Sequence, residues 1–211
     1  MCSYILHSSG SKRSAHSNAY TYGFWKNQRI VLFDTIIGGE EREKVEKLYK
    51  DKTSEAKDAN RGMSNDEVLA VTGHELGHWR LRHFHMYLVM IAISLLLMIL
   101  VFAYFCKSEA LFKAFGFSTT PVIIGIILVY TFILAPYSEL VKVVFNVVSR
   151  RCEFAADSFS ADLGYTDQLI SSLKNLTKEN LMPPIDDELY SMCNNNHPTV
   201  LERIEALKKR K

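Results

Sequence analysis

The sequence has little of what a disulfide-stabilised or nucleic-acid-binding protein needs. It contains four cysteines in 211 residues, and none of them forms a CxxC or other paired spacing, so we expect free thiols in a reducing compartment. The formal net charge is only +2, and no basic stripe with interleaved aromatic residues is present, so nucleic acid is not an expected partner.

The amino terminus lacks the pattern of a cleaved secretion signal. Residues 1–20 have neither a basic start nor an apolar stretch, and both are needed for such a signal. We therefore expect membrane insertion to depend on internal apolar segments, or on sequence upstream of this chain.

Charge is missing from two long internal segments. Residues 86–106 (MYLVMIAISLLLMILVFAYFC) are all uncharged, and a helix of this length, at about 1.5 Å per residue, crosses a hydrocarbon core of about 30 Å. A second apolar segment, 114–148, is interrupted by two prolines, two glycines, one glutamate and one lysine. We predict two membrane spans here; the alternative, core helices of a large soluble enzyme, are rarely so long and uncharged.

The two predicted spans form a hairpin with an uneven distribution of basic residues. Arg80 and Arg82 precede the first span and Arg150 and Arg151 follow the second, whereas the link contains two lysines and one glutamate. By the positive-inside rule, both outer ends face the cytosol and the link faces the lumen.

The motif HELGH at residues 74–78 precedes the first span. Two histidines four apart on a helix present both imidazoles to one metal ion, and Glu75 between them is then placed as the general base of a zinc protease. Ser64 and Glu67 form a capping box that begins a helix predicted over residues 64–85. The alternative is a helix with two surface histidines and no metal.

A catalytic zinc site needs a third protein ligand. The metzincin pattern places glycine three and histidine six residues after the second histidine, but Leu81 and Phe84 occupy those positions, and His83 is displaced by one. The remaining solution is a carboxylate from a later helix.

The helix predicted over residues 150–164 offers that carboxylate. Glu153 and Asp157 are four apart and share one helical face. We predict that Glu153 completes the zinc site with His74 and His78, and that Asp157 accepts a hydrogen bond from a ligand histidine, His74 by preference. Most acid pairs at this spacing are solvated surface, which is the alternative.

The remaining segments support a mainly helical protein. Alternating apolar residues over 17–37 predict a small β-hairpin. Gly164 is a predicted helix C-cap, and residues 165–211 predict a helical tail with Pro198 in the first turn of its last helix.

Several stretches together resemble the type I zinc CAAX prenyl protease family, membrane proteases that trim prenylated proteins. They cover nearly the whole chain: residues 11–20 (SKRSAHSNAY), 26–35 (KNQRIVLFDT), 74–78 (HELGH), 150–157 (RRCEFAAD), and 197–198 (HP) followed by 201–203 (LER). The resemblance implies a mainly α, integral membrane fold with gluzincin-like helices, a two-span hairpin and a small β-hairpin. Related bacterial heat-shock proteases share the ligands but match the first two stretches less closely.

The resemblance also implies roles for individual residues. It implies one zinc ion per chain, bound by the three ligands already predicted, with Glu75 as the base. Asn18 is implied to lie on an edge strand to which the substrate backbone adds. His197 and Arg203 are implied to contact substrate and stabilise the developing oxyanion.

The implied reaction is hydrolysis after an isoprenylated cysteine, which releases the last three residues of the substrate. The implied partners are a prenylated protein or peptide and the lipid bilayer, and the implied location is the endoplasmic reticulum, with the inner nuclear membrane as a further site. The family has seven spans around a chamber, so we expect the missing amino-terminal spans to come from a longer gene product or a partner. The alternatives are a membrane quality-control protease of wider scope and a catalytically inactive truncated scaffold.

Overall fold

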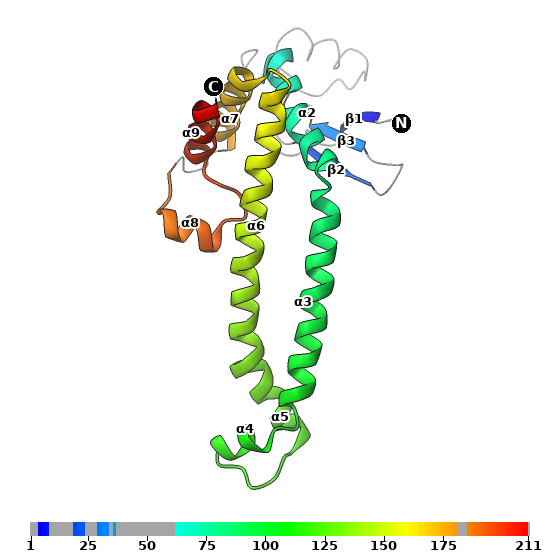
Figure 1. Ribbon diagram of the computed structural model, residues 1–211, viewed down its shortest axis with the longest axis vertical. Coiled ribbons are helices and arrows are strands. Elements are labelled where there is room, and N and C mark those ends of the chain that lie inside the picture. The colour runs from blue at the N-terminus through cyan, green and yellow to red at the C-terminus, as the bar shows by residue number, and fades with distance from the viewer. Residues whose placement is uncertain are drawn as a thin grey trace, which may run out of the picture.

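The protein is mainly helical, as predicted. The computed structural model describes residues 4–8, 19–23, 29–33, 36, 62–180 and 185–210. Two long helices, α3 (His83–Phe105) and α6 (Ala135–Asp162), stand side by side. Figure 1 shows the sheet and the remaining large helices gathered at one end of this pair and a short link at the other. This arrangement confirms the predicted helical hairpin.

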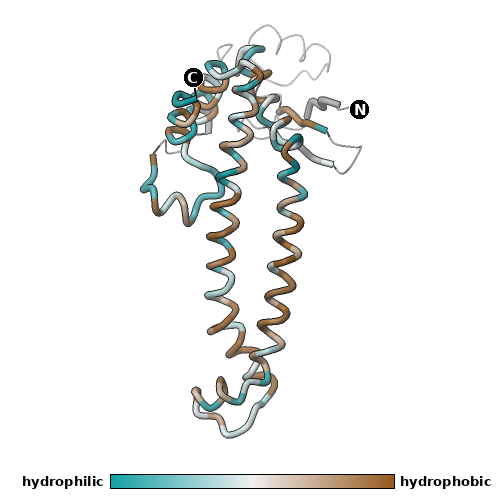
Figure 2. The backbone as a smooth tube through the Cα atoms, in the orientation of Figure 1, coloured by the Kyte–Doolittle hydropathy of each residue, from teal (hydrophilic) through white to brown (hydrophobic). Residues whose placement is uncertain are grey.

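Two helical segments are long and apolar enough to cross a membrane. They are α3 and a second segment, Val122–Asp162, that includes α6. Figure 2 shows hydrophobic residues along both long helices. The most apolar stretch of α3 is not buried inside the protein at all, which suits a surface that faces lipid.

The second span differs from the prediction of one segment over 114–148. Helix α4 (Glu109–Ala114) ends where that segment was expected to begin, and Gly116, at φ 81°, lies in the turn that follows. The span starts with α5 (Val122–Leu128), passes through a π-helical turn, η3 (Val129–Leu134), and continues as α6. Because α6 continues to Asp162, it also contains the predicted third-ligand helix.

Helix α2 (Asn65–Arg80) is shorter than the helix predicted over 64–85. Its capping box is present: Ser64 N–H donates to Glu67 Oε2 at 2.8 Å, and Glu67 N–H donates to Ser64 Oγ at 3.3 Å. The helix ends because Arg82 adopts a left-handed conformation at φ 58°, which costs a non-glycine residue about 1–2 kcal/mol. No glycine or proline marks this break, so the sequence did not reveal it.

The sheet contains the predicted hairpin and one further strand. Strands β2 (Ala19–Tyr22) and β3 (Arg29–Phe33) are antiparallel, with Ala19 opposite Leu32. Strand β1 (Tyr4–Ser8), which was not predicted, pairs in parallel with β3, so the order is β1-β3-β2. Among the described strands, β2 is therefore at an edge. Asn18 lies outside the described residues.

Helices α7 (Thr166–Asn180), α8 (Glu188–Asn194) and α9 (Val200–Arg210) form the tail. The C-cap of α6 is Leu163, so Gly164, which was predicted as the C-cap, lies one residue beyond it at φ 92°. Pro198 does not lie in the first turn of α9, because Thr199 and Glu202 form a capping box after it. A core joins α2, α7 and α9 through Ala70, Leu169, Ile170, Leu173, Ile204 and Leu207.

The cysteines in the described residues are free thiols, in agreement with the prediction. Cys106, Cys152 and Cys193 form no disulfide, and Cys2 lies outside the described residues.

Helix α2 packs against α6 at two buried glycines, Gly73 and Gly77. A Cβ atom on Gly77 would lie 3.0 Å from Ala156 Cα and 3.1 Å from the Ala156 carbonyl oxygen. Beyond Gly73, Ser160 Oγ donates to the Ala70 carbonyl at 2.8 Å. This close approach sets the separation of the histidines on α2 from the carboxylates on α6.

We expect Gly77→Val to separate the two helices and to weaken metal binding. The added side chain meets helix backbone that cannot move away cheaply, and overpacking of this kind costs about 1–3 kcal/mol. Zinc content after dialysis and the temperature of thermal unfolding would both fall, whereas Ala206→Val, at an exposed position of α9, would change neither appreciably. Unchanged zinc content in Gly77→Val would show that the glycine does not set the site.

Candidate metal site

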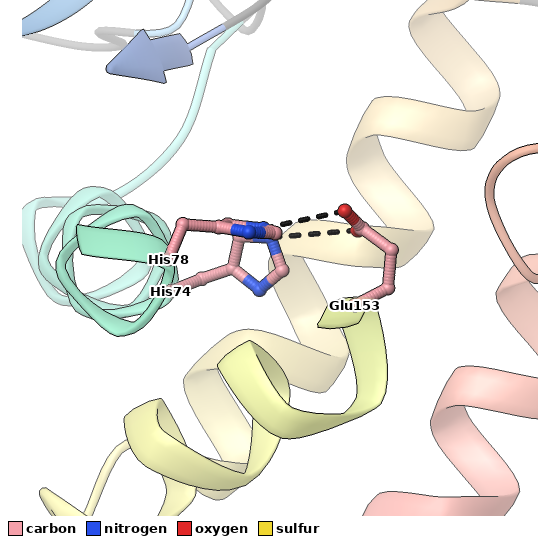
Figure 3. Close-up of side chains that lie close together, drawn as sticks. All are labelled: His74, His78 and Glu153. Carbon is pink, nitrogen blue, oxygen red and sulfur yellow. Dashed lines mark hydrogen bonds and ion pairs between the residues drawn. The ribbon is translucent and has the colours of Figure 1, made fainter. Parts of the chain in front are cut away.

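His74, His78 and Glu153 converge from two helices. The histidines lie on α2 and the glutamate on α6, and one ligand atom from each lies within 4.8 Å of the others. His78 Nε2 is 3.2 Å from Glu153 Oε1, His74 Nε2 is 3.5 Å from Glu153 Oε2, and the two Nε2 atoms are 3.1 Å apart. Figure 3 shows the three side chains pointing toward one another. Tertiary structure thus brings Glu153 to two histidines that lie 75 or more positions earlier in the chain.

Asp157 lies behind His74, on the side away from Glu153. Its Oδ1 is 2.8 Å from His74 Nδ1, so the structure brings these two residues into contact. Arg203, from α9, donates to both oxygens of the same carboxylate, Nε to Oδ2 at 2.8 Å and Nη2 to Oδ1 at 2.6 Å. The Asp157 side chain is only 3% exposed and that of Arg203 is 13% exposed, so this is a buried, bidentate ion pair.

His78 has a partner that the sequence analysis did not identify. His83 Nδ1 lies 2.9 Å from His78 Nδ1, and His83 is buried. The left-handed turn at Arg82 brings His83 back toward α2. A ligand histidine commonly donates its second ring N–H to a fixed acceptor, which sets its tautomer and orientation. The proximity of a third histidine to the motif was the only sequence signal.

We expect His83→Phe to lower zinc affinity about 10- to 100-fold, the usual effect of losing such a partner. Competition with a chromophoric chelator would measure this. His85→Phe is a matched control, because His85 is exposed and lies two residues further along. Equal affinities of the His83 variant and the unmodified chain would mean that the contact does not orient His78.

Glu75 is partly buried beside the three converging side chains. Burial raises the pKa of its carboxyl group above the ordinary value, although His74, His78 and Arg203 act in the opposite direction. A carboxylate with a raised pKa is a better proton acceptor near neutral pH.

His197 and Arg203 approach Glu153 from the tail. His197 Nδ1 is 3.2 Å from Glu153 Oε2, and the His197 side chain is 58% exposed. The hydrogen bond to the Glu153 carboxylate raises the pKa of His197. Arg203 Nη1 is 3.5 Å from the same oxygen, but its guanidinium is fixed by Asp157. The two residues therefore differ, because His197 is open to solvent and Arg203 is not.

A cavity of about 410 Å³ opens beside these residues. Edge strand β2 contributes Ala19 and Tyr20 to its wall, and α7 contributes apolar side chains that include Leu173 and Leu176. The polar part of the wall comes from His74, Glu75, His78, Glu153, His197 and Arg203. Residues of β2 therefore line the same cavity as Glu75 and the three converging side chains.

The donor set fits a catalytic metal. Two imidazole nitrogens and one carboxylate oxygen are the ligands of one class of catalytic zinc site, in which the fourth position stays open for water or substrate. The second nitrogen of each histidine has a partner, Asp157 for His74 and His83 for His78.

Comparison with known proteins agrees with this geometry. The profile of the family described as Peptidase family M48 matches residues 6–211. The chain belongs to peptidase family M48. Membership of this metalloprotease family implies a metal, and the His74, His78 and Glu153 group is where the described residues could hold one.

The relatives that this M48 chain resembles include two proteins with the same name. It is 50% identical over 203 residues to "CAAX prenyl protease 1 homolog" of Caenorhabditis elegans and 42% identical over 214 residues to the protein of the same name from Homo sapiens. Each alignment covers 94% of this chain, but only 46% and 45% of those relatives. The chain thus spans less than half the length of these curated relatives.

A solved structure shows the same fold. The crystal structure of S. mikatae Ste24p superposes with a TM-score of 0.69 at 30% sequence identity, and the match covers 96% of this chain and 44% of that chain. The expected family is therefore confirmed, and with it an integral membrane metalloprotease fold.

Proposed function

We propose that this chain carries the zinc site of a membrane endopeptidase that removes the last three residues of prenylated CAAX proteins. The observation that carries the proposal is that His74, His78 and Glu153 converge beside Glu75, in a cavity bordered by an edge strand. The names of the relatives in worm and human support the substrate class.

His74, His78 and Glu153 would hold one zinc ion. When bound, zinc supplies a Lewis acid that polarises the scissile carbonyl and lowers the pKa of water. Asp157 and His83 would fix the two histidines so that each presents Nε2 to the metal. This division of contacts follows from the distances, because each histidine has its Nδ1 turned toward its partner.

Glu75 would act as the general base and then as the general acid. It takes a proton from the attacking water and returns that proton to the leaving amine. Its position between the two histidines on α2 places it against the cavity. The raised pKa of its carboxyl group favours both transfers.

His197 and Arg203 would stabilise the developing oxyanion. His197 is exposed at the cavity and can donate a hydrogen bond to substrate. Arg203 contributes a fixed positive charge, since Asp157 holds its guanidinium and leaves Nη1 on the Glu153 side. A preorganised charge of this kind stabilises the transition state without reorganisation.

Substrate backbone would add to β2, an edge strand among the described strands. Ala19 and Tyr20 of this strand line the cavity, and an extended peptide can add to an edge strand of a sheet through main-chain hydrogen bonds. Asn18, immediately before β2, is proposed to hold the peptide at this edge.

The membrane location suits the proposed substrate. A prenyl chain partitions into lipid, and α3 enters its apolar stretch directly after the metal site. We propose that the zinc site faces the cytosol in the endoplasmic reticulum membrane, and in the inner nuclear membrane as well. The partners would be the bilayer, the prenylated substrate and further membrane spans, which the additional sequence of the longer relatives could provide.

The test uses the detergent-purified chain and two peptides that share one CAAX sequence. One peptide has a farnesylated cysteine and the other a free cysteine, and zinc content is measured on the same preparation. We expect one zinc per chain and cleavage of the farnesylated peptide alone, with loss of both after chelation. Equal cleavage of both peptides would favour a quality-control protease, and zinc without cleavage would favour an inactive scaffold.

A further inference from the structure

Arg150 is a buried cation on α6 that the mechanism above does not use. It lies three residues before Glu153 and is 8% exposed. Its guanidinium points to the tail of the chain. Nη1 donates to Ser191 Oγ at 2.7 Å and to the His197 carbonyl oxygen at 3.5 Å, and Nη2 donates to Glu202 Oε1 at 2.6 Å.

These acceptors surround the segment 195–199. Ser191 lies in α8 before the segment, Glu202 lies in the first turn of α9 after it, and His197 lies within it. The second oxygen of Glu202 accepts from the Thr199 N–H at 2.7 Å and from its hydroxyl at 2.9 Å. Arg150 and Glu202 together thus fasten the segment to α6 at both of its ends.

The same helix carries the group that His197 must reach. Glu153 lies one turn along α6 from Arg150, and its Oε2 is 3.2 Å from His197 Nδ1. Because the His197 side chain is 58% exposed, close packing around the ring does not set its direction. Apart from the contact with Glu153, its direction depends on the backbone of segment 195–199, and that backbone is held by Arg150.

We propose that Arg150 is a positioning residue that holds segment 195–199 so that His197 faces the metal site. The inference rests on the substrate-contacting role of His197 in the proposed function. Arginine suits the task better than lysine, because its planar fork can serve several acceptors in different directions at once, whereas an ammonium is a single point charge on a flexible stem.

A double-mutant cycle tests whether Arg150 acts through His197. Cleavage of the farnesylated peptide is measured for the unmodified chain, Arg150→Met, His197→Ala and the double variant. We expect Arg150→Met to lower kcat/KM about 10- to 100-fold, the effect of misplacing a catalytic group by about 1 Å, with zinc content unchanged. In the His197→Ala background the same substitution should lower it less than about 3-fold, since the group it positions is gone.

Two further variants separate positioning from charge. Arg151→Met removes the same charge from the neighbouring exposed position and should leave kcat/KM unchanged. Arg150→Lys keeps the charge and should recover only part of the activity, because lysine cannot replace the fork. If Arg150→Met does not fold, Ser191→Ala removes a single acceptor and should show the same pattern with a smaller effect.

Hydrogen exchange provides a readout that needs no turnover. Amides in 195–199 should exchange faster in Arg150→Met than in Arg151→Met, whereas amides of α7 should not change. An equal loss of cleavage in both His197 backgrounds, loss of zinc, or unchanged exchange in 195–199 would overturn the inference. If His197→Ala alone leaves cleavage unchanged, the proposed role of His197 fails, and exchange still decides whether Arg150 holds the segment.

Discussion

Glu75→Gln is expected to lower kcat for peptide cleavage about 10²- to 10⁴-fold, the range that general acid–base catalysis contributes. Glutamine has nearly the same shape as glutamate but cannot accept the proton of the attacking water. Zinc content should stay at one per chain, because Glu75 is not one of the three converging ligands. Turnover of the farnesylated peptide and metal analysis on the same preparation would check both parts.

The control for Glu75→Gln is Glu205→Gln, an equal change at an exposed position of α9. It should leave kcat and zinc content unchanged. Two results would count against the assignment: near-normal cleavage by Glu75→Gln would remove Glu75 as the base, and loss of zinc would mean that its carboxylate helps to hold the metal.

Of the substitutions considered, Asp157→Ala is expected to cause the largest loss of stability. It leaves the buried guanidinium of Arg203 without its bidentate partner and leaves His74 Nδ1 without its acceptor. Breaking a buried ion pair by removing one partner costs about 3–5 kcal/mol, and losing the partner of a metal-ligating histidine costs about 10- to 100-fold in metal affinity. The thermal unfolding temperature of the metal-free chain and zinc affinity by competition would measure the two effects separately.

A second substitution distinguishes the two contacts of Asp157. In the double variant Asp157→Ala, Arg203→Met the unpaired buried charge is gone, so much of the stability should return. Zinc affinity should stay low, because His74 still lacks its acceptor. Recovery of zinc affinity together with stability would show that Asp157 supports the site only through Arg203.

The sequence predicted the secondary structure best where local hydrogen bonding decides it. The capping box at Ser64 and Glu67 begins α2 as expected, and the alternation around Ala19 and Leu32 forms the expected hairpin. Strand β1 was missed, and helix α8 was not distinguished as a separate helix within the predicted helical tail. Strand β1 precedes β2 in the sequence but pairs with β3, so its partner is not its neighbour along the chain. Helix α8 is short and is held by contacts with α6, such as the hydrogen bond that Asn146 Nδ2 donates to the Cys193 carbonyl at 2.6 Å.

In the candidate site, too, some residues could be predicted from the sequence and others could not. The motif and the family resemblance point to His74, Glu75, His78 and Glu153, and the structure brings the three proposed ligands together. His83 could not be predicted, because on an uninterrupted helix a residue five positions beyond His78 points away from it. Only the left-handed turn at Arg82 brings the two rings to 2.9 Å.

The sequence by itself determined the metal-binding motif, the family and the two apolar spans, because each is a local pattern of spacing or composition. Only the tertiary structure decided how the charged residues around the motif are paired. Arg203 on α9 pairs with Asp157 on α6, and Arg150 on α6 pairs with Glu202 on α9, so each pair joins segments far apart in the chain. Burial then makes each pairing specific, since a buried charge is stable only beside a group that compensates it.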